Sequence, residues 1–229
     1  MMLFKINIGN TNNLKRKNMK LIDAYKQKKF GTLTKDDHYF EIYDFWLKEK
    51  QNQIKKVLEI GICKGGSLAL WKEYFTNAEI VGIDIDKSCK QFETSGVKVY
   101  IGSQSDKEFL TYITQVEKEF DLIIDDGSHE YQDQIISFEA LFPFLKDNGL
   151  YIIEDLGTSY FSSYGYGSKP SFVDYLKDMV DDVNYAAINY DDKTANYPNK
   201  KISDVHFYNS MCIIRKSNVE QSVFKQIKG

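Results

Sequence analysis

Two different periods of apolar residues alternate along the chain from residue 56 onward. Runs of Val, Ile and Leu too short for helices are each followed by a longer stretch whose apolar residues recur every three or four positions. This alternation of buried strand and amphipathic helix is typical of a doubly wound parallel sheet. We expect five strands, at residues 56–61, 79–86, 97–102, 120–127 and 149–156.

The residues before this core are predicted to form an accessory segment. Asn- and Lys-rich residues 1–18 are expected to be a flexible arm. Residues 19–55 have a helical pattern, in which Ile42, Phe45 and Trp46 are spaced to share one helix face. We therefore expect a small N-terminal helical cap.

The C-terminal part completes the same domain. We expect a helix at residues 172–183 and two closing strands, 184–190 and 204–216, which end in a hairpin. The sequence thus predicts one Rossmann-like α/β domain over residues 19–229, with its core at 56–216. Its sheet has seven strands, mostly parallel, with helices on both faces.

Charge separates two regions of the chain. The 229 residues contain 30 Lys+Arg and 33 Asp+Glu, so the net charge is only -3, and bulk binding of nucleic acid is not expected. Residues 1–56 carry 13 basic and 6 acidic residues, whereas residues 121–192 carry 15 acidic and 3 basic residues. Part of this acidic stretch is a candidate for cation binding.

The cysteines and the hydropathy indicate a soluble cytoplasmic protein. Cys63, Cys89 and Cys212 are odd in number and widely spaced, so they predict neither a disulfide framework nor a zinc site. No apolar run approaches 18 residues, so membrane insertion is not expected. The sequence allows a homo-oligomer.

The first expected strand leads into a glycine-rich turn, LEIGICKGGS at residues 58–67. Gly61 and Gly65 would let the backbone approach a ligand, and the following helix would direct N–H groups toward it. A dinucleotide fingerprint requires glycine where Cys63 stands, which argues against NAD or FAD. A tight turn that binds nothing is the alternative.

An acidic residue after the second strand identifies a better-fitting cofactor. Asp84 lies 23 residues after Gly61, where a carboxylate can accept hydrogen bonds from both ribose hydroxyls of a nucleoside. S-adenosylmethionine has such a ribose and no phosphate, and Glu59 is expected near its ammonium group. The candidate cofactor-binding residues are therefore Glu59, Gly61, Gly65, Ser67 and Asp84.

Polar clusters follow the fourth and fifth strands. Asp125 and Asp126 end the fourth strand, and Glu154 and Asp155 end the fifth. These carboxylates are expected to converge, because the carboxyl ends of parallel strands face one crevice, and a cation would relieve their repulsion. We expect Asp126, Glu154 and Asp155 to bind Mg²⁺ or another hard divalent cation. Asp125 is added to the cofactor-binding candidates. As an alternative, Asp125 or Asp126 only caps the helix that follows.

A histidine lies close to the predicted metal ligands. His129, three residues after Asp126, is expected to act as general base on a sugar hydroxyl that the metal activates. Tyr160, Tyr164 and Tyr166 lie in the following Gly/Ser-rich loop, which suits either a lid over the substrate or a plain surface loop.

Several of these segments together resemble a known family. The segments are LEIGICKGGS, VGIDID, IIDDGSH, LFPFLKDNGLYIIEDLGTSY and HFYNSMCIIRK. They are similar to the class I, S-adenosylmethionine-dependent and metal-dependent sugar O-methyltransferases, particularly the macrolide-sugar enzymes, and more distantly to the cephalosporin hydroxylase-like group. The likeness extends over roughly residues 30–216.

The resemblance implies roles for particular residues. It implies that Asp126, Glu154 and Asp155 bind Mg²⁺ and that His129 is the base. It also adds Ser103 and Gln104 to the cofactor-binding candidates, on the adenine side. Two departures concern the acceptor: the macrolide enzymes have a large N-terminal domain that these 229 residues do not include, and their G-T-D-K-like segment is replaced by GTLTKDDH.

The expected activity is therefore O-methylation of a sugar hydroxyl, with Asp126 and His129 as the catalytic residues. The acceptor is expected to be a glycan or nucleotide-sugar precursor, as in polysaccharide biosynthesis, or a glycosylated natural product. Two alternatives remain: methylation of a small vicinal diol or catechol, and a catalytically silent cofactor-binding subunit.

Overall fold

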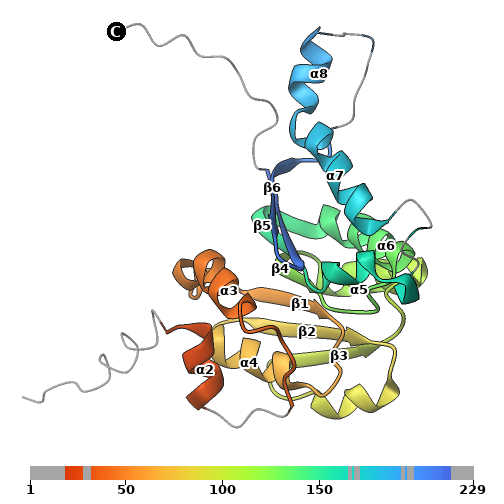
Figure 1. Ribbon diagram of the computed structural model, residues 1–229. Coiled ribbons are helices and arrows are strands. Elements are labelled where there is room, and N and C mark those ends of the chain that lie inside the picture. Colours follow the sequence, from red (N-terminus) through yellow and green to blue (C-terminus); the bar gives the residue numbers. More distant parts are fainter. Residues whose placement is uncertain are drawn as a thin grey trace, which may run out of the picture.

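A single mixed sheet organises the structure (Figure 1). The computed structural model describes residues 19–27, 32–164, 167, 171–191, 194 and 199–217. The strand order is β3-β2-β1-β4-β5-β7-β6, in which β1 to β5 are parallel and β7 runs antiparallel to β5 and β6. This confirms the predicted seven-stranded, mostly parallel sheet. The strands are β1 (Lys56–Ile60), β2 (Glu79–Asp84), β3 (Val97–Ile101), β4 (Phe120–Asp125), β5 (Leu145–Ile153), β6 (Ile202–Tyr208) and β7 (Met211–Lys216).

Helices cover both faces of this sheet, because strand residues alternate between two hydrophobic clusters. On β4, Leu122 and Ile124 belong to the cluster under α2, α3 and α4, whereas Ile123 belongs to the cluster under α5, α6 and α7. The α-helices are α2 (Leu21–Gln27), α3 (Tyr39–Leu47), α4 (Gly66–Tyr74), α5 (Lys107–Glu117), α6 (Tyr131–Leu141), α7 (Phe172–Val183) and α8 (Tyr185–Asp191). Short 3₁₀ turns are η1 (Lys48–Lys50), η2 (Lys87–Phe92), η3 (Phe142–Phe144), η4 (Leu156–Tyr160) and η5 (Ser162–Tyr164).

Helices α2 and α3 form the N-terminal cap. Helix α3 buries Tyr39 and Tyr43, which lie one turn apart on the same face. Ile42 and Trp46 are half-buried, but Phe45 is 78% exposed, so the packing expected for Phe45 is wrong. The face of α3 that packs inward is therefore set by the two tyrosines.

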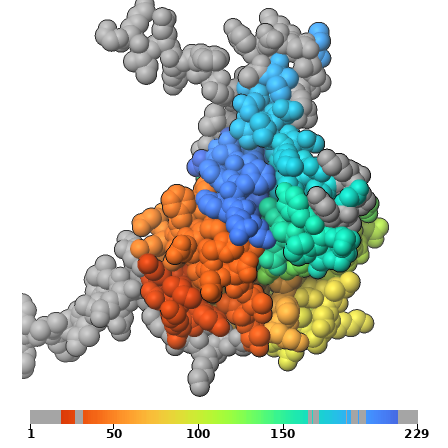
Figure 2. All heavy atoms as spheres, in the orientation of Figure 1, coloured from red at the N-terminus to blue at the C-terminus, as the bar shows by residue number. Residues whose placement is uncertain are grey.

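The cap also contacts the C-terminal hairpin. Trp46 Nε1 donates a hydrogen bond to the Tyr208 hydroxyl at 2.9 Å, which connects α3 to the edge strand β6. The space-filling view shows the orange cap lying directly against the blue hairpin (Figure 2). The predicted boundaries of arm, cap and core stay a prediction, and residues 1–18 lie outside the described residues.

The C-terminal strands differ from the prediction in one element. Residues 185–191 form helix α8, so the strand expected at 184–190 is wrong. Alanines favour a helix, and so short an apolar pattern does not distinguish the two periods. Both closing strands come from residues 202–216, joined by a turn in which Ser210 has a φ of 60°.

Among the residues that the structure describes, no helix combines the length and apolar character needed to cross a lipid bilayer.

Candidate functional site

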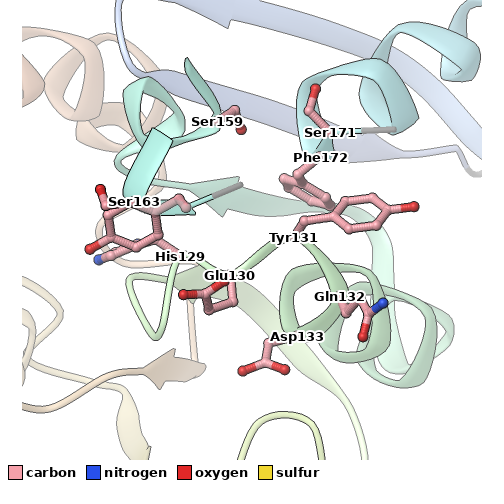
Figure 3. A pocket seen from close by; sticks show the side chains of 10 residues that line it. His129, Glu130, Tyr131, Gln132, Asp133, Ser159, Ser163, Ser171 and Phe172 are labelled. Atoms are coloured by element: carbon pink, nitrogen blue, oxygen red, sulfur yellow. The ribbon is translucent and has the colours of Figure 1, made fainter. Parts of the chain in front are cut away.

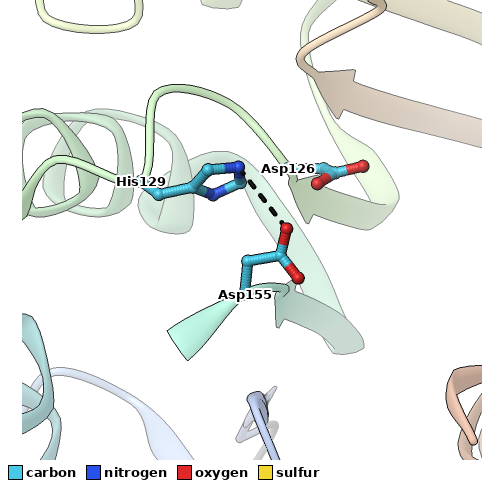
Figure 4. A group of neighbouring side chains, drawn as sticks. All are labelled: Asp126, His129 and Asp155. Atoms are coloured by element: carbon cyan, nitrogen blue, oxygen red, sulfur yellow. Dashed lines mark ion pairs between the residues drawn. The ribbon is translucent and has the colours of Figure 1, made fainter. Parts of the chain in front are cut away.

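The ends of β4 and β5 bring three titratable side chains together (Figure 4). Asp126 directly follows β4, Asp155 lies two residues beyond β5, and His129 lies in the loop that leads to α6. One ligand atom from each of the three lies within 4.8 Å of the others, and His129 Nε2 is 3.6 Å from Asp155 Oδ2. They come together because β4 and β5 are neighbours in the sheet.

Two of these residues adopt a backbone conformation that is rare outside glycine. His129 has a φ of 59° and Asp155 a φ of 56°. Left-handed backbone costs roughly 1–2 kcal/mol per residue and persists only where the surroundings fix it. Both side chains are therefore held in place by strained backbone at the edge of the sheet.

Glu154 lies beside this group and pairs with a residue from the cap. The Lys35 ammonium is 2.6 Å from Glu154 Oε1 and 3.0 Å from Asp126 Oδ2, and its side chain is only 1% exposed. Burial alone would lower the pKa of Lys35, but Glu154 and Asp126 raise it above its usual value. Burial raises the pKa of Glu154 to about 7, although Lys35 and the Tyr43 hydroxyl oppose the rise. A positive charge is thus placed among the carboxylates of Asp126, Glu154 and Asp155, which we call the acidic edge.

A cavity of about 230 Å³ opens between the glycine turn and the end of β3; we call it the loop cavity. Four of the predicted cofactor-binding residues line it: Gly61, Asp84, Ser103 and Gln104. Asp84 Oδ2 accepts hydrogen bonds from the backbone N–H groups of Ile62 at 2.7 Å and Cys63 at 3.1 Å. Asp84 therefore also holds the glycine turn against β2.

The other predicted cofactor-binding residues do not line the loop cavity. Glu59 is fully buried beneath the turn, where it accepts hydrogen bonds from the Ser67 hydroxyl at 2.8 Å and Trp71 Nε1 at 2.9 Å. Burial raises the pKa of the Glu59 carboxyl to about 8. Gly65 lies under the ring of Phe92. These contacts support the turn from below, so a direct contact with a cofactor stays a prediction.

Asp125 and Gln104 position the loop that carries His129. Asp125 is fully buried and accepts a hydrogen bond from the Ser137 hydroxyl at 2.6 Å. The Gln104 amide donates to Asp125 Oδ1 at 3.3 Å, and its carbonyl oxygen accepts the N–H of Ser128 at 2.7 Å. Burial raises the pKa of Asp125, against the hydrogen bonds from Ser137 and Gln104. Gln104 thus connects the loop cavity to the loop of His129.

A second cavity, of about 380 Å³, opens on the other side of His129; we call it the His129 cavity (Figure 3). The first turns of α6 form one wall, and residues of η4, η5 and α7 form the other. Its lining consists of hydroxyl, amide, carboxylate and aromatic groups: His129, Glu130, Tyr131, Gln132, Asp133, Ser159, Ser163, Tyr164, Ser171 and Phe172. Asp133 lines both cavities, so they adjoin each other at the first turn of α6. Tyr166, predicted in a lid, lies outside the described residues.

The donor groups at the acidic edge fit a hard divalent cation. Among the described residues, all hydrogen bonds to the carboxylates of Asp126 and Glu154 go to one oxygen of each, which leaves Asp126 Oδ1 and Glu154 Oε2 free. His129 Nδ1 is buried and has no hydrogen-bond partner in the described part of the chain. Carboxylate oxygens suit Mg²⁺ or another hard divalent cation, and the unpaired His129 nitrogen beside them is available to accept a proton.

Comparisons with known proteins connect this geometry to a family. Residues 58–156 match a sequence family described as a methyltransferase domain. The chain is 33% identical over 216 residues to mycinamicin VI 2''-O-methyltransferase of Micromonospora griseorubida, covering 88% of this chain and 53% of the relative. It is 35% identical over 211 residues to demethylmacrocin O-methyltransferase of Streptomyces fradiae, covering 86% and 52%.

A solved structure has the same architecture. The MycE methyltransferase of the mycinamycin pathway, in complex with Mg and SAH, aligns with a TM-score of 0.73 and 32% identity over 86% of this chain and 53% of that one. A second structure of that enzyme, with Mg, SAH and mycinamycin VI, aligns with a TM-score of 0.70 and 31% identity, over 86% and 52%. The chain carries a methyltransferase domain. Its fold is the Rossmann-like class I methyltransferase fold.

The chain spans about half the length of the curated relatives it matches. A further relative, L-olivosyl-oleandolide 3-O-methyltransferase of Streptomyces antibioticus, is 33% identical over 199 residues, covering 80% of this chain and 50% of the relative, and its name specifies a glycosylated natural product. The expectation of polysaccharide biosynthesis finds no support in these names. The match to the methyltransferase domain includes the glycine turn, Asp84, His129 and the carboxylates, but begins only after the cap has ended.

Sequence reasoning missed three side chains that contact the acidic edge, namely Lys35, Tyr39 and Tyr43, and one that lines the loop cavity, Ile85. The three cap residues lie outside the family match and between 91 and 119 positions before the carboxylates they contact. The spacing of four residues between Tyr39 and Tyr43 was the available signal for the two tyrosines. Ile85 is 74% exposed beside Asp84, an apolar side chain where a polar one is usual.

Proposed function

We propose that this protein transfers the methyl group of S-adenosylmethionine to a hydroxyl of a sugar, with a divalent cation and His129 as general base. One observation carries the proposal: Asp126, His129 and Asp155 converge, and two of them line two cavities that share Asp133. Asp126 lines the loop cavity, and His129 lines the other. A donor and an acceptor bound in the two cavities would therefore meet at these three side chains.

The loop cavity is the proposed cofactor site. Gly61 and Asp84 would contact the ribose side of S-adenosylmethionine, and Ser103 and Gln104 the adenine side. Glu59, Gly65, Ser67 and Asp125 would act from beneath by holding the turn and the neighbouring loop. The Mg and SAH in the structures of the MycE methyltransferase support this assignment.

The acidic edge is the proposed metal site. Asp126 and Glu154 would hold a divalent cation through Oδ1 and Oε2, which accept no hydrogen bond from the described residues, and Asp155 through Oδ2, which also faces His129. When bound, such a cation stabilises the alkoxide form of an acceptor hydroxyl and so lowers its pKa. Asp155 also orients His129, since its Oδ2 lies 3.6 Å from Nε2.

His129 is the proposed base. As the acceptor hydroxyl attacks the methyl carbon, the new C–O bond forms, the S–CH₃ bond breaks, and the hydroxyl proton passes to the imidazole. S-adenosylhomocysteine leaves with the electron pair on sulfur. The strained backbone at His129 keeps the imidazole at the boundary of the two cavities, where alignment of donor and acceptor supplies much of the rate.

The lining of the His129 cavity favours an uncharged glycoside as the acceptor. Ser159, Ser163 and Gln132 offer hydrogen bonds to sugar hydroxyls, and Tyr131 and Phe172 offer aromatic faces. Among its described lining residues, two are carboxylates, Glu130 and Asp133, and none is Lys or Arg. A nucleotide-linked sugar would bring phosphates against these carboxylates, so we favour a glycosylated natural product over a nucleotide-sugar precursor.

Methyl transfer by the purified chain, measured by S-adenosylhomocysteine release, tests the proposal. The acceptor panel contains rhamnosides, glycosylated macrolides, nucleoside-diphosphate sugars and catechols. We expect turnover with neutral glycosides, loss of turnover with a chelator, recovery with Mg²⁺, and a decrease of about 10²–10⁴-fold in His129→Ala. His206→Ala, which removes a histidine on β6, is the matched control and should retain turnover.

The other outcomes separate the alternatives. Turnover only with catechols would favour a small vicinal-diol substrate. Binding of S-adenosylmethionine without turnover on the whole panel would favour a silent cofactor-binding subunit. Turnover that neither chelation nor His129→Ala changes would overturn the mechanism.

A further inference from the structure

One face of the N-terminal cap contacts all three carboxylates of the acidic edge. Lys35, Tyr39 and Tyr43 are spaced four residues apart, and Tyr39 and Tyr43 occupy successive turns of α3. We call these three residues the cap stripe. Its three polar ends reach Asp126, Glu154 and Asp155 across the gap between α3 and the sheet edge.

The contacts are divided so that each carboxylate is held through one oxygen only. Lys35 binds Asp126 Oδ2 at 3.0 Å and Glu154 Oε1 at 2.6 Å. The Tyr43 hydroxyl donates to the same Oε1 of Glu154. The Tyr39 hydroxyl lies 2.9 Å from Asp155 Oδ1 and accepts the Asp155 backbone N–H at 3.1 Å.

The remaining oxygens are left without partners from the cap stripe. Asp126 Oδ1 and Glu154 Oε2 accept no hydrogen bond from the described residues, and Asp155 Oδ2 is directed at His129. A network that existed only to neutralise the acids would have no reason to avoid one oxygen of every carboxylate. The arrangement instead fits carboxylates that are aimed at a common ligand.

The charges are consistent with the same reading. Three ionised carboxylates and the Lys35 ammonium together carry two negative charges, which one divalent cation would neutralise. The side chains of Lys35 and Glu154 are 1% and 2% exposed, so solvent contributes little to their neutralisation. A buried carboxylate without a positive partner is strongly unfavourable, and Lys35 supplies that partner before a cation arrives.

We propose that the cap stripe positions the metal carboxylates: Lys35, Tyr39 and Tyr43 together hold one oxygen of each carboxylate and leave the other to face the cation. These are positioning residues, since they act through Asp126, Glu154 and Asp155. The inference rests on the metal site of the proposed function and adds residues outside the segment that matches the methyltransferase family. It also gives the cap a role in catalysis beyond covering the sheet.

Calorimetric titration of the full chain with Mg²⁺ alone, without cofactor or acceptor, tests the inference independently of turnover. Tyr39→Phe and Tyr43→Phe remove only the hydroxyl, and we expect each to raise the Kd for Mg²⁺ roughly 10-fold. Tyr74→Phe is the matched control, because its hydroxyl contacts Asp44 at 3.3 Å instead of the acidic edge. Its Kd should equal that of the unsubstituted protein.

Lys35 is tested by thermal unfolding. In metal-free buffer, Lys35→Met should lower Tm by roughly 5–10 °C, because Glu154 and Asp126 lose their positive partner. Mg²⁺ should then raise Tm more in Lys35→Met than in the unsubstituted protein, since the cation replaces the missing charge. Lys35→Arg keeps the charge, so its Tm in metal-free buffer should lie between the Tm of Lys35→Met and that of the unsubstituted protein.

The outcomes distinguish this inference from the function on which it rests. If the unsubstituted protein binds Mg²⁺ and both tyrosine variants bind it equally well, the cap stripe does not position the carboxylates and only this inference fails. If the unsubstituted protein binds neither Mg²⁺ nor Mn²⁺, the proposed metal site and the inference fail together. A Lys35→Met protein that fails to fold leaves the tyrosine variants as the deciding measurement.

Discussion

A Cβ atom placed on Gly61 would lie 2.0 Å from the carbonyl oxygen of Asp126. The two residues end neighbouring strands, because β1 and β4 pair in parallel with Ile60 opposite Asp125. The Asp126 N–H also donates to the Ile60 carbonyl at 2.9 Å. The glycine after β1 thus makes room for the backbone of a predicted metal ligand as well as for a cofactor.

Gly61→Ala is therefore expected to disturb the acidic edge. The substitution combines overpacking against backbone with a φ of 87°, and we expect a loss of about 1–3 kcal/mol in the free energy of unfolding together with weaker Mg²⁺ binding. Gly167→Ala is the matched control, since Gly167 has a φ of 96° but no atom within 4 Å of its added Cβ. Urea unfolding of both variants checks this. Equal losses in the two would show that backbone conformation alone matters.

A second prediction concerns Ile85, which is 74% exposed and lines the loop cavity. An exposed isoleucine is costly in water unless a ligand covers it, and the adenine of S-adenosylmethionine would do so. We expect Ile85→Ser to raise the Kd for S-adenosylhomocysteine roughly 10-fold, for a loss of about 1.4 kcal/mol, without changing Tm. Val180→Ser, at a 59% exposed position on α7, is the control. An unchanged Kd for S-adenosylhomocysteine in Ile85→Ser would show that the adenine does not cover Ile85.

The third prediction concerns Gln104, whose amide bridges Asp125 and the N–H of Ser128. Gln104→Leu keeps most of the volume but leaves the Ser128 N–H unpaired and removes one donor from the buried Asp125, so we expect a loss of about 1–3 kcal/mol in the free energy of unfolding. We also expect a larger decrease in turnover than in metal affinity, because the loop that carries His129 loses its support. Gln115→Leu, at an exposed position on α5, should change neither. Equal turnover in the two variants would contradict the supporting role.

Much of the fold could be predicted because burial repeats along the chain. Strands β1, β2 and β4 are apolar runs buried on both faces, a pattern that is typical of the central strands of a parallel sheet. Residues 184–190 were ambiguous, since two alanines and one isoleucine between polar residues suit either period. The buried face of α3 was missed because Tyr39 and Tyr43 are fixed by their hydroxyl partners as much as by burial of their rings.

The candidate site could be predicted where it is local in sequence. Asp126 and His129 share one loop and Glu154 is adjacent to Asp155, so the strand ends alone indicated the acidic edge. Lys35 could not be found in this way, because a lysine in a polar loop carries no periodic or motif signal of burial. Only the three-dimensional approach of α3 to β5 reveals that its ammonium is a buried counter-ion.

The last prediction concerns a buried carboxylate far from the acidic edge. The Glu117 side chain is 1% exposed and accepts hydrogen bonds from Lys56 Nζ at 2.9 Å, Lys98 Nζ at 3.0 Å and the Tyr100 hydroxyl, which connect α5 to β1 and β3. Burial alone would raise the pKa of Glu117, but hydrogen bonds from Tyr100, Lys56 and Lys98 hold it below its usual value. We expect Glu117→Gln to lower the free energy of unfolding by about 1–3 kcal/mol at pH 7.

The lowered pKa fixes how this difference changes with pH. Glu117 binds a proton more readily in the unfolded chain than in the folded one. Its contribution to the free energy of unfolding is therefore fully present above the unfolded pKa, about 4.3, and is lost as the pH falls through the lower folded pKa. In metal-free buffer, urea unfolding should give a constant difference in the free energy of unfolding between Glu117→Gln and the unsubstituted protein from about pH 6.5 to 8. In this range the pH is at least two units above about 4.3, so the carboxylate is ionised in both states. The gap should narrow as the solution is acidified below that pKa. Glu119→Gln, at an exposed position, should show no gap. A gap that stays constant on acidification would mean that the carboxylate charge of Glu117 does not stabilise the fold.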